Sequence, residues 1–239
     1  GTGDAVKCGI DEVTEADKVL VLYGDVPLIK ENTLKELIDS SNDGISILTT
    51  VLDKPFGYGR VSKDRDGNAI AIIEEKDATE DEKNINEIFT GVLCARTDFL
   101  KEGLLEIKDD NAAGEFYLTD IVSIMNNKGI KINTYVASND EVKGANSHRE
   151  LAELEGIFRE MKAQDILDMG ITVSDPSRLD VRGEVTSGKD CSIDVNVILE
   201  GNVELGDNVS IGPNCVIKNT SIESNSKIDA FCHIDGAKV

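Results

Sequence analysis

The sequence predicts an α/β domain followed by a parallel β-helix. The aliphatic run Val19–Leu22 is typical of a buried strand, and it leads directly into Gly24 and Asp25. Segments typical of strands and helices alternate from there to residue 169. From Ile193 onward, the aliphatic residues recur with a period of six. The first two observations predict the α/β domain, and the third predicts the β-helix.

The run Val19–Leu22 shows no polar alternation, which favours a strand buried on both faces of a parallel sheet. The strand must end before Pro27, which cannot donate to a strand ladder. Ligands of parallel sheets bind outside the carboxyl ends of the strands, where we expect Asp25. A carboxylate there can hold a hard cation that binds phosphate oxygens. Alternatively, Asp25 caps the helix expected at 29–40, and the spacing leaves both interpretations open.

Further elements follow in alternation. We expect helices at 4–13, 29–40, 97–107, 115–127 and 148–169, and strands at 45–52, 60–62, 69–75, 88–96 and 131–136. This order predicts a mostly parallel sheet. Residues 64–68, with the sequence DRDGN, predict a hairpin turn.

The period of six is the strongest single signal in the chain. The repeat positions are Ile193, Leu199, Leu205, Ile211 and Ile217, and after a slip of one residue Ile222, Ile228 and Ile234. Gly206 and Gly212 each follow a repeat residue, where we expect a tight corner. Neither an α-helix nor an ordinary sheet produces this period, so it predicts a parallel β-helix.

Composition excludes several classes of partner. The net charge of −21 argues against binding to nucleic acid or to an anionic membrane. No apolar run approaches the roughly 20 residues that span a bilayer, and no signal peptide opens the chain. The cysteines are widely spread and lack metal-binding spacing, which predicts reduced, buried thiols in a cytoplasmic protein: Cys8, Cys94, Cys191, Cys215 and Cys232.

Several loops carry glycine and polar residues at the ends of expected elements. Gly1–Gly3 precedes a helix and can present backbone N–H groups to a ligand. The other such segments are 57–60 (GYGR), 74–78 (EEKDA), 114–120 (GEFYLTD) and 141–146 (EVKGAN). Each of them, taken alone, is better explained as a turn, a helix cap or a solvated charge. His148 is expected at the surface, at the start of a helix.

Taken together, these motifs resemble a known family. With 22–28 (LYGDVPL) and 175–178 (DPSR), they occur in the order and spacing of the bacterial bifunctional N-acetylglucosamine-1-phosphate uridylyltransferase / glucosamine-1-phosphate acetyltransferase family. The resemblance covers essentially the whole chain. It implies a Rossmann-like nucleotidyltransferase domain at 1–147, a linker helix at 148–170 and the start of a left-handed β-helix at 171–239. It also implies a cytoplasmic homotrimer.

The resemblance implies specific roles for eight residues. Gly1 and Thr2 match a pair that contacts the uridine nucleotide, and Tyr23 and Gly24 match residues that line its pocket. Asp25 and Asn146 match ligands of Mg²⁺, and Asn146 also touches the sugar nucleotide. Gly59 and Glu74 match groups that hold the amino sugar.

The implied reaction joins UTP and N-acetylglucosamine 1-phosphate to UDP-N-acetylglucosamine and releases pyrophosphate. The sugar phosphate oxygen attacks the α-phosphorus in line, which requires positioning and charge neutralisation and no catalytic side chain. Mg²⁺ is the implied cofactor. The full family protein also acetylates glucosamine 1-phosphate with acetyl-CoA.

Three departures from the family accompany the resemblance. The family's N-terminal Gly-rich loop and its acetyltransferase site have no counterpart here, so we expect an internal fragment that is inactive alone. Phe89 stands where the family usually has an Asn that contacts the sugar, and Phe can neither donate nor accept a hydrogen bond. Two alternatives remain: another sugar-1-phosphate nucleotidylyltransferase with a hexapeptide tail, or a non-catalytic trimerising module.

Overall fold

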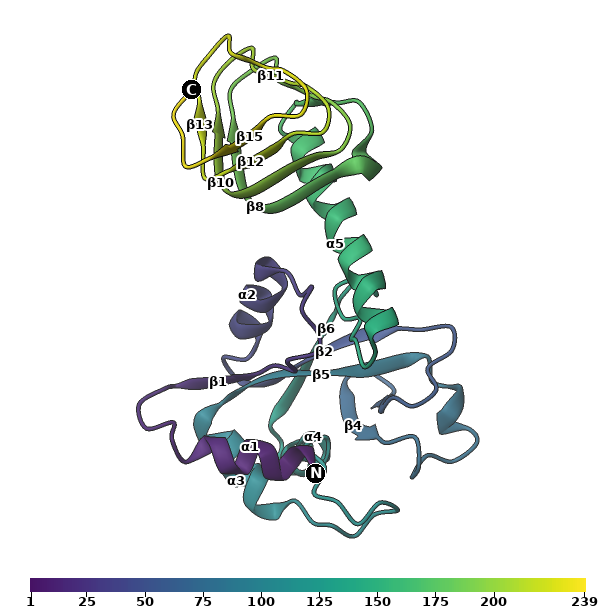
Figure 1. Cartoon of the computed structure of the whole chain (residues 1–239). Coiled ribbons are helices and arrows are strands. Elements are labelled where there is room, and N and C mark those ends of the chain that lie inside the picture. Colours follow the sequence, from purple (N-terminus) through teal and green to yellow (C-terminus); the bar gives the residue numbers. More distant parts are fainter. The chain divides into compact units, whose positions relative to one another are not determined.

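The computed structural model describes all 239 residues, which form two compact units, Gly1–Asn146 and Ser147–Val239. The first unit contains a mixed sheet with helices on both faces, and the second is a β-helix preceded by a long helix (Figure 1). No helix combines the length and apolar composition that crossing a membrane requires.

The sheet of the first unit has six strands. They are β1 (Lys18–Val21), β2 (Gly44–Val51), β3 (Arg60–Lys63), β4 (Ala69–Ile73), β5 (Glu87–Arg96) and β6 (Lys131–Val136). The order is β4-β3-β5-β2-β6, and β1 pairs with β5. Every strand expected from the sequence is present. The turn at 64–68 also forms, with the Asn68 N–H donating to Asp64 Oδ1 at 2.9 Å.

The helices of this unit are α1 (Thr2–Ile10), α2 (Glu31–Ser40), α3 (Thr97–Glu106) and α4 (Asp120–Asn127), with a short 3₁₀ turn at Glu82–Asn84. Side chains alternate across β5, so Val92 and Cys94 pack in one apolar cluster with Leu37 of α2. Leu93 and Ala95 belong to the opposite cluster, with residues of α1, α3 and α4. The sheet is therefore covered on both faces, which Figure 1 shows.

The prediction of a mostly parallel sheet is wrong. Only β2 and β6 pair in parallel, whereas β5 runs antiparallel to β1, β2 and β3, and β3 antiparallel to β4. The residues of β1 are only half-buried, because the strand pairs on one side alone. An aliphatic run therefore indicated a strand correctly but not its direction or the number of its neighbours.

One helix begins later than predicted. Residues 114–119 form a bend and turns, and α4 starts at Asp120 rather than at residue 115. The Gly114 N–H donates to the Asn111 carbonyl at 3.1 Å, and Gly114 has a φ of +63°. Such a backbone conformation is left-handed and ends the preceding turn instead of starting a helix. The segment 114–119 is thereby free to line a cavity.

The second unit begins with α5 (His148–Asp168), and the exposed His148 opens it as expected. The β-helix strands are β7 (Thr172–Val173), β8 (Leu179–Ser187), β9 (Ser192–Ile193), β10 (Val197–Leu205), β11 (Ser210–Ile211), β12 (Val216–Lys218), β13 (Ser221–Ile222), β14 (Lys227–Ile228) and β15 (His233–Asp235), with a 3₁₀ turn at Pro176–Arg178. All their pairings are parallel.

Strand register confirms the hexapeptide prediction, including its slip. Leu199 lies opposite Ile217, 18 residues later, whereas Ile217 lies opposite Ile234, 17 residues later. The omitted residue shortens one corner, so the apolar column stays in register. The repeat residues from Ile193 to Ile228 are buried in one core, against which Ile234 packs.

Most of the left-handed corner positions of the β-helix are occupied by asparagine, and neither of the two glycines occupies one. Neither Gly206 nor Gly212 has a positive φ, whereas Asn196, Asn208 and Asn214 do. Asparagine tolerates this conformation better than most residues. A Cβ at Gly206 would lie 2.5 Å from the backbone nitrogen of Ser224 on the next coil. Glycine is therefore required there because successive coils approach closely.

All five cysteines are free. Cys94, Cys191 and Cys215 are buried and Cys232 is half-buried, whereas Cys8 is exposed. The prediction of buried thiols is thus wrong for Cys8, which lies on α1, a helix whose only buried residues are Gly3 and Ile10.

Candidate active site

The first unit contains a cavity of about 330 Å³ beside the sheet. Its walls come from the start of α1, the loop after β1, the loop before β3, the end of β4, the middle of β5 and the loops 115–119 and 142–146. The lining residues are Thr2, Tyr23, Asp25, Val26, Gly57, Tyr58, Gly59, Glu74, Phe89, Thr90, Gly91, Glu115, Tyr117, Thr119, Val142, Gly144 and Asn146.

Most of the predicted site residues meet in this cavity. Thr2, Tyr23, Asp25, Gly59, Glu74 and Asn146 line it, whereas Gly1 and Gly24 do not. The Gly3 N–H donates to the Phe116 carbonyl at 2.8 Å. This backbone group is therefore not presented to a ligand, contrary to one sequence interpretation of 1–3.

Asp25 and Asn146 are brought together by backbone contacts. The Ala145 N–H donates to the Asp25 carbonyl at 3.0 Å. A Cβ at Gly144 would lie 3.7 Å from Asp25 Oδ2, so the two loops pass very close to each other. The Asp25 side chain itself is exposed to the cavity and makes no hydrogen bond or ion pair.

The alternative roles of these two residues as helix caps are not observed. The N-cap of α2 is Lys30, which makes no side-chain capping bond. The N-cap of α5 is Ser147, whose hydroxyl accepts the Glu150 N–H at 3.2 Å. Helix capping therefore explains neither Asp25 nor Asn146.

A buried carboxylate fixes the loop that leads to Asn146. Glu141 accepts a hydrogen bond from the Thr33 hydroxyl of α2 at 2.6 Å and another from Ser138 at 3.2 Å. Lys30 lies 3.5 Å from the same carboxylate. Burial acts to raise the pKa of Glu141, but the hydrogen bond from Thr33 and the charge of Lys30 outweigh it and hold that pKa below its ordinary value.

Tyr23 packs on a glycine of β5. A Cβ at Gly91 would lie 2.4 Å from Cε2 of the tyrosine ring, and Gly91 has a φ of +90°. Only glycine allows both the contact with the tyrosine ring and the positive φ. Burial raises the pKa of the Tyr23 phenol, and the charges of Glu74 and Asp25 add to this effect. Tyr23 is therefore a neutral phenol at the cavity wall.

Glu74 and Gly59 form the opposite part of the wall. The Thr119 hydroxyl donates to Glu74 Oε1 at 2.9 Å. A Cβ at Gly59 would lie 3.6 Å from both carboxylate oxygens of Glu74 and 2.7 Å from Ile72, so no larger residue fits there. Near this wall, burial raises the pKa of Asp120, together with the charges of Glu74 and Asp77.

The structure adds residues to which the sequence assigned no role. Thr90 and Gly91 line the cavity, as do Tyr117 and Val142 of the segments 114–120 and 141–146. A glycine inside an expected strand was the available signal for Gly91, since it often marks a close approach. Phe89, predicted to disturb the site, lines the cavity and is also buried in the apolar cluster of the sheet.

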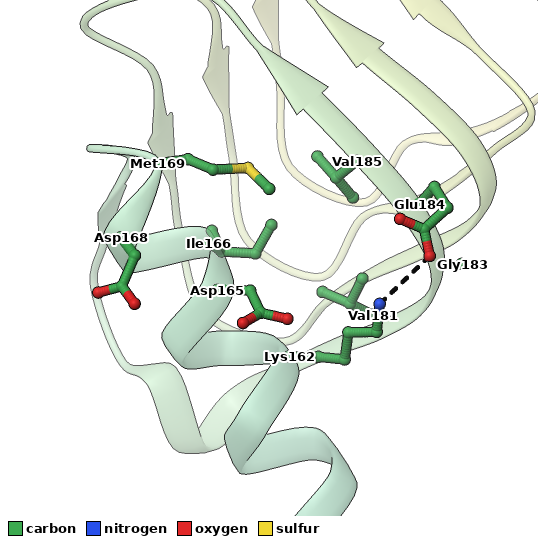
Figure 2. A pocket seen from close by; sticks show the side chains of 9 residues that line it. All are labelled: Lys162, Asp165, Ile166, Asp168, Met169, Val181, Gly183, Glu184 and Val185. Carbon is green, nitrogen blue, oxygen red and sulfur yellow. Dashed lines mark hydrogen bonds and ion pairs between the residues drawn. The ribbon is translucent and has the colours of Figure 1, made fainter. Parts of the chain in front are cut away.

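A second cavity lies between α5 and β8 of the second unit (Figure 2). Figure 2 shows Ile166, Val181 and Val185 in its wall. At its edge, Lys162 Nζ forms an ion pair with Glu184 Oε1 at 3.3 Å. None of the predicted site residues lies here. The cavity of the first unit therefore remains the candidate active site.

Comparison with known proteins identifies relatives over the whole chain. The chain is 48% identical to a protein named "Bifunctional protein GlmU" from Paraburkholderia phymatum, over 100% of this chain and 53% of that protein. It is 44% identical to the GlmU of Dechloromonas aromatica, over 100% of this chain and 53% of that protein. It is 45% identical to the GlmU of Methylococcus capsulatus, over 84% of this chain and 44% of that protein.

A family model and a solved structure support the two folds separately. The model for bacterial transferase hexapeptide (six repeats) matches residues 188–219. A Bacillus anthracis structure assigned as a glucose-1-phosphate thymidylyltransferase, solved with sucrose, superposes with a TM-score of 0.51. It covers 66% of this chain and 60% of its own, at 20% identity, and so shows a likeness of fold alone.

The chain spans about half the length of the relatives that match it throughout. The match includes both the mixed sheet with its cavity and the hexapeptide repeats, at 44 to 48% identity. By its sequence, the chain is therefore similar, over its whole length, to about half of the length of these bifunctional GlmU proteins.

Proposed function

We propose that the Gly1–Asn146 unit binds UTP and N-acetylglucosamine 1-phosphate and belongs to an enzyme that joins them into UDP-N-acetylglucosamine. The observation that carries the proposal is the convergence of Thr2, Tyr23, Asp25, Glu74 and Asn146 on one cavity. These residues are far apart in the sequence, and the similarity of the chain to the GlmU proteins supports their shared role. The coarser activity, nucleotidyl transfer to a sugar phosphate, is that of the family.

The donor set at one end of the cavity fits a magnesium ion. Asp25 offers a carboxylate without a protein partner as one metal ligand. Asn146, on a loop that contacts the Asp25 backbone, offers its amide oxygen as a second ligand. Mg²⁺ binds through one or two protein oxygens and completes its shell with water and phosphate. When bound, it supplies neutralisation of the triphosphate charge.

The remaining residues position the two substrates. Thr2 and Tyr23 line the side that we assign to the nucleotide, and Gly59 and Glu74 line the side that we assign to the amino sugar. An oxygen of the sugar phosphate forms a bond to the α-phosphorus of UTP, and the bond from that phosphorus to the pyrophosphate oxygen breaks. The protein contributes position and electrostatic complementarity, which suffice for phosphoryl chemistry of this kind.

One observation favours a second candidate, a related enzyme for a different sugar. Phe89 places an apolar ring in the cavity wall, close to the polar groups that we assign to substrate binding. The phenyl ring has no donor or acceptor atom that could form a hydrogen bond with a sugar hydroxyl or an acetamido group. The test of the proposal must therefore compare nucleotide sugars that differ in the sugar.

Calorimetric titration of this chain tests both candidates. UDP-N-acetylglucosamine, UDP-glucose and dTDP-glucose are added in turn with excess Mg²⁺, and then with a chelator in its place. We expect UDP-N-acetylglucosamine to bind most tightly and to weaken when Mg²⁺ is removed. Preference for another nucleotide sugar would establish the second candidate. Absence of binding by all three would favour a non-catalytic module.

The second unit is proposed to drive association. Hexapeptide β-helices present flat parallel sheets, and the family resemblance implies a homotrimer in the complete protein. The acetylation of glucosamine 1-phosphate with acetyl-CoA is likewise proposed for that complete protein and not for these residues alone.

A further inference from the structure

A buried arginine lies behind the wall formed by Gly59 and Glu74. Arg60, the first residue of β3, is only 2% exposed and is the largest of the fully buried side chains. It does not line the cavity itself. Burying a guanidinium is costly unless its hydrogen bonds are made within the protein. Its partners therefore indicate what the burial achieves.

The guanidinium joins two separate segments. One terminal nitrogen donates to the Tyr58 carbonyl, and the other donates to Glu75 Oε2 at 2.5 Å. Glu75 also accepts the Gly57 N–H at 3.3 Å. The loop 57–59 and the segment that follows β4 are thus tied to one charged pair, and Gly59 and Glu74 lie on these two segments.

We propose that Arg60 is a positioning residue, which sets the distance between Gly59 and Glu74 and thereby shapes the sugar side of the cavity. The proposal rests on the function proposed above. The guanidinium is the only cation paired with Glu75, which lies next to Glu74. Without Arg60, the Tyr58 carbonyl loses its donor, and Glu75 loses its ion-pair partner. The Nε atom has no hydrogen-bond partner, so the two bonds from the terminal nitrogens are what tie the segments together.

The test compares two ligands on four variants of this chain. UDP-N-acetylglucosamine carries the sugar and UTP does not, and both are titrated calorimetrically with Mg²⁺. The variants are Arg60→Lys, Arg60→Met, the double variant Arg60→Met with Glu75→Gln, and Arg96→Met. Arg96 is the matched control because it forms an exposed pair with Asp98 away from the cavity. Thermal unfolding is measured in parallel.

We expect Arg60→Lys and the double variant to bind UDP-N-acetylglucosamine at least tenfold more weakly, with UTP changed less than threefold. Arg96→Met should bind both ligands as the original chain does. The double variant removes the unpaired charge, so its thermal unfolding should recover relative to Arg60→Met. A purely structural role predicts that its sugar binding recovers too, which would overturn the proposal.

Two further outcomes separate this proposal from the proposed function. If the original chain binds neither ligand, the function fails, and the positioning role fails with it. If the original chain binds both and Arg60→Lys loses equal affinity for each, the function stands but Arg60 does not act on the sugar side. Should Arg60→Met fail to fold, the lysine and double variants still decide the matter.

Discussion

At the scale of single residues, the structure separates groups that face the cavity from groups that support it. The Asp25 carboxylate is exposed to the cavity and makes no hydrogen bond or ion pair within the protein. Glu141 is buried and accepts the Thr33 hydroxyl, and Arg60 is buried and donates to Glu75, although its Nε has no hydrogen-bond partner. A polar group without a protein partner in a cavity is available to a ligand, whereas a buried group that bonds to the protein holds the surrounding segments in place.

Substitution of Asp25 and Asn146 tests the metal site. In a complete family protein that carries these residues, we expect Asp25→Asn nearly to abolish uridylyl transfer and Asn146→Ala to lower it strongly. Asp25 supplies the only formal negative charge of the pair, so its loss should matter more. The measurement is a uridylyl-transfer assay at saturating Mg²⁺.

Acetyl transfer by the same variants is the control, because we propose that it belongs to the β-helix, a compact unit distinct from the one that contains Asp25 and Asn146. It should persist in both. If Asp25→Asn transferred the uridylyl group as fast as the unsubstituted protein, Asp25 would not be a ligand of the metal. Equal loss of both activities would indicate unfolding instead.

Phe89 is a second residue-scale test. Phe89→Asn in this chain should tighten binding of N-acetylglucosamine 1-phosphate by about 0.5–1.5 kcal/mol, the usual contribution of one hydrogen bond. It should also lower the free energy of unfolding by about 3 kcal/mol, because the ring is 5% exposed and belongs to the core. Calorimetry and urea unfolding measure the two effects.

Phe89→Leu is the matched control, since leucine shrinks the side chain without adding a hydrogen-bonding group. It should lower stability and leave the affinity unchanged. Equal affinities for the asparagine variant and the original chain would mean that the sugar does not contact this position.

At the scale of elements, contacts between α2 and the loop 141–146 set the geometry of the site. The bond from Thr33 to Glu141 joins the first turn of α2 to this loop at 2.6 Å. The Ala145 N–H then joins the loop to Asp25 at 3.0 Å. The position of Asn146 relative to Asp25 therefore depends on a helix that contributes no residue to the cavity.

Glu141→Gln should lower the free energy of unfolding at neutral pH by about 1–3 kcal/mol, since Thr33 and Lys30 lose a charged partner. The pKa of Glu141 is held below its ordinary value of 4.5 in the folded protein. Its stabilisation is therefore present above pH 4.5 and is lost as the pH falls through the lowered folded value.

Urea unfolding of the original chain and of Glu141→Gln, from pH 7 down to pH 3, measures this difference. The two stabilities should converge at the acidic end. A matched control is Glu31→Gln, because Glu31 forms only an exposed pair with Lys35 on the same helix. A constant difference at every pH would show that the charge of Glu141 is not the stabilising feature.

At the scale of the whole molecule, two folding units of different construction are joined in one chain. The mixed sheet buries its core under helices on two faces. The β-helix buries a central column of repeat residues. Its core extends to Ile228, whereas Ile234 and Cys232 are only partly buried. The last coil is thus less well covered than the others, and the exposed Phe231 lies on it.

Incomplete cover of the last coil predicts weak association of this chain. Exposed backbone edges and apolar residues of a terminal coil pair with other chains without a fixed partner. Light scattering across a concentration series should show polydisperse species whose mean mass rises with concentration. Phe231→Asn is the comparison, because it removes the exposed ring and suits the left-handed backbone at φ +62°. A clean, stable trimer for the original chain would contradict the prediction.

The sequence by itself determined the local features of both units. Hexapeptide spacing specified the β-helix, its buried column and even the shortened coil after Ile217, because a period of six is a local property of the chain. The positions of nearly all strands and helices followed from hydrophobic patterns in the same way. The motifs around Asp25, Glu74 and Asn146 marked residues that the fold then brought together.

Only the tertiary structure decided how these elements meet. The direction of β1 against β5, the exposure of Cys8 and the close packing of Tyr23 on Gly91 all depend on partners distant in the chain. Hydrophobic pattern reports whether a residue is buried, but strand direction depends on which neighbour supplies the hydrogen bonds. The sequence likewise did not indicate that Arg60 and Glu141 hold the loops around the cavity. A charged residue is expected to be exposed unless its buried partners are known.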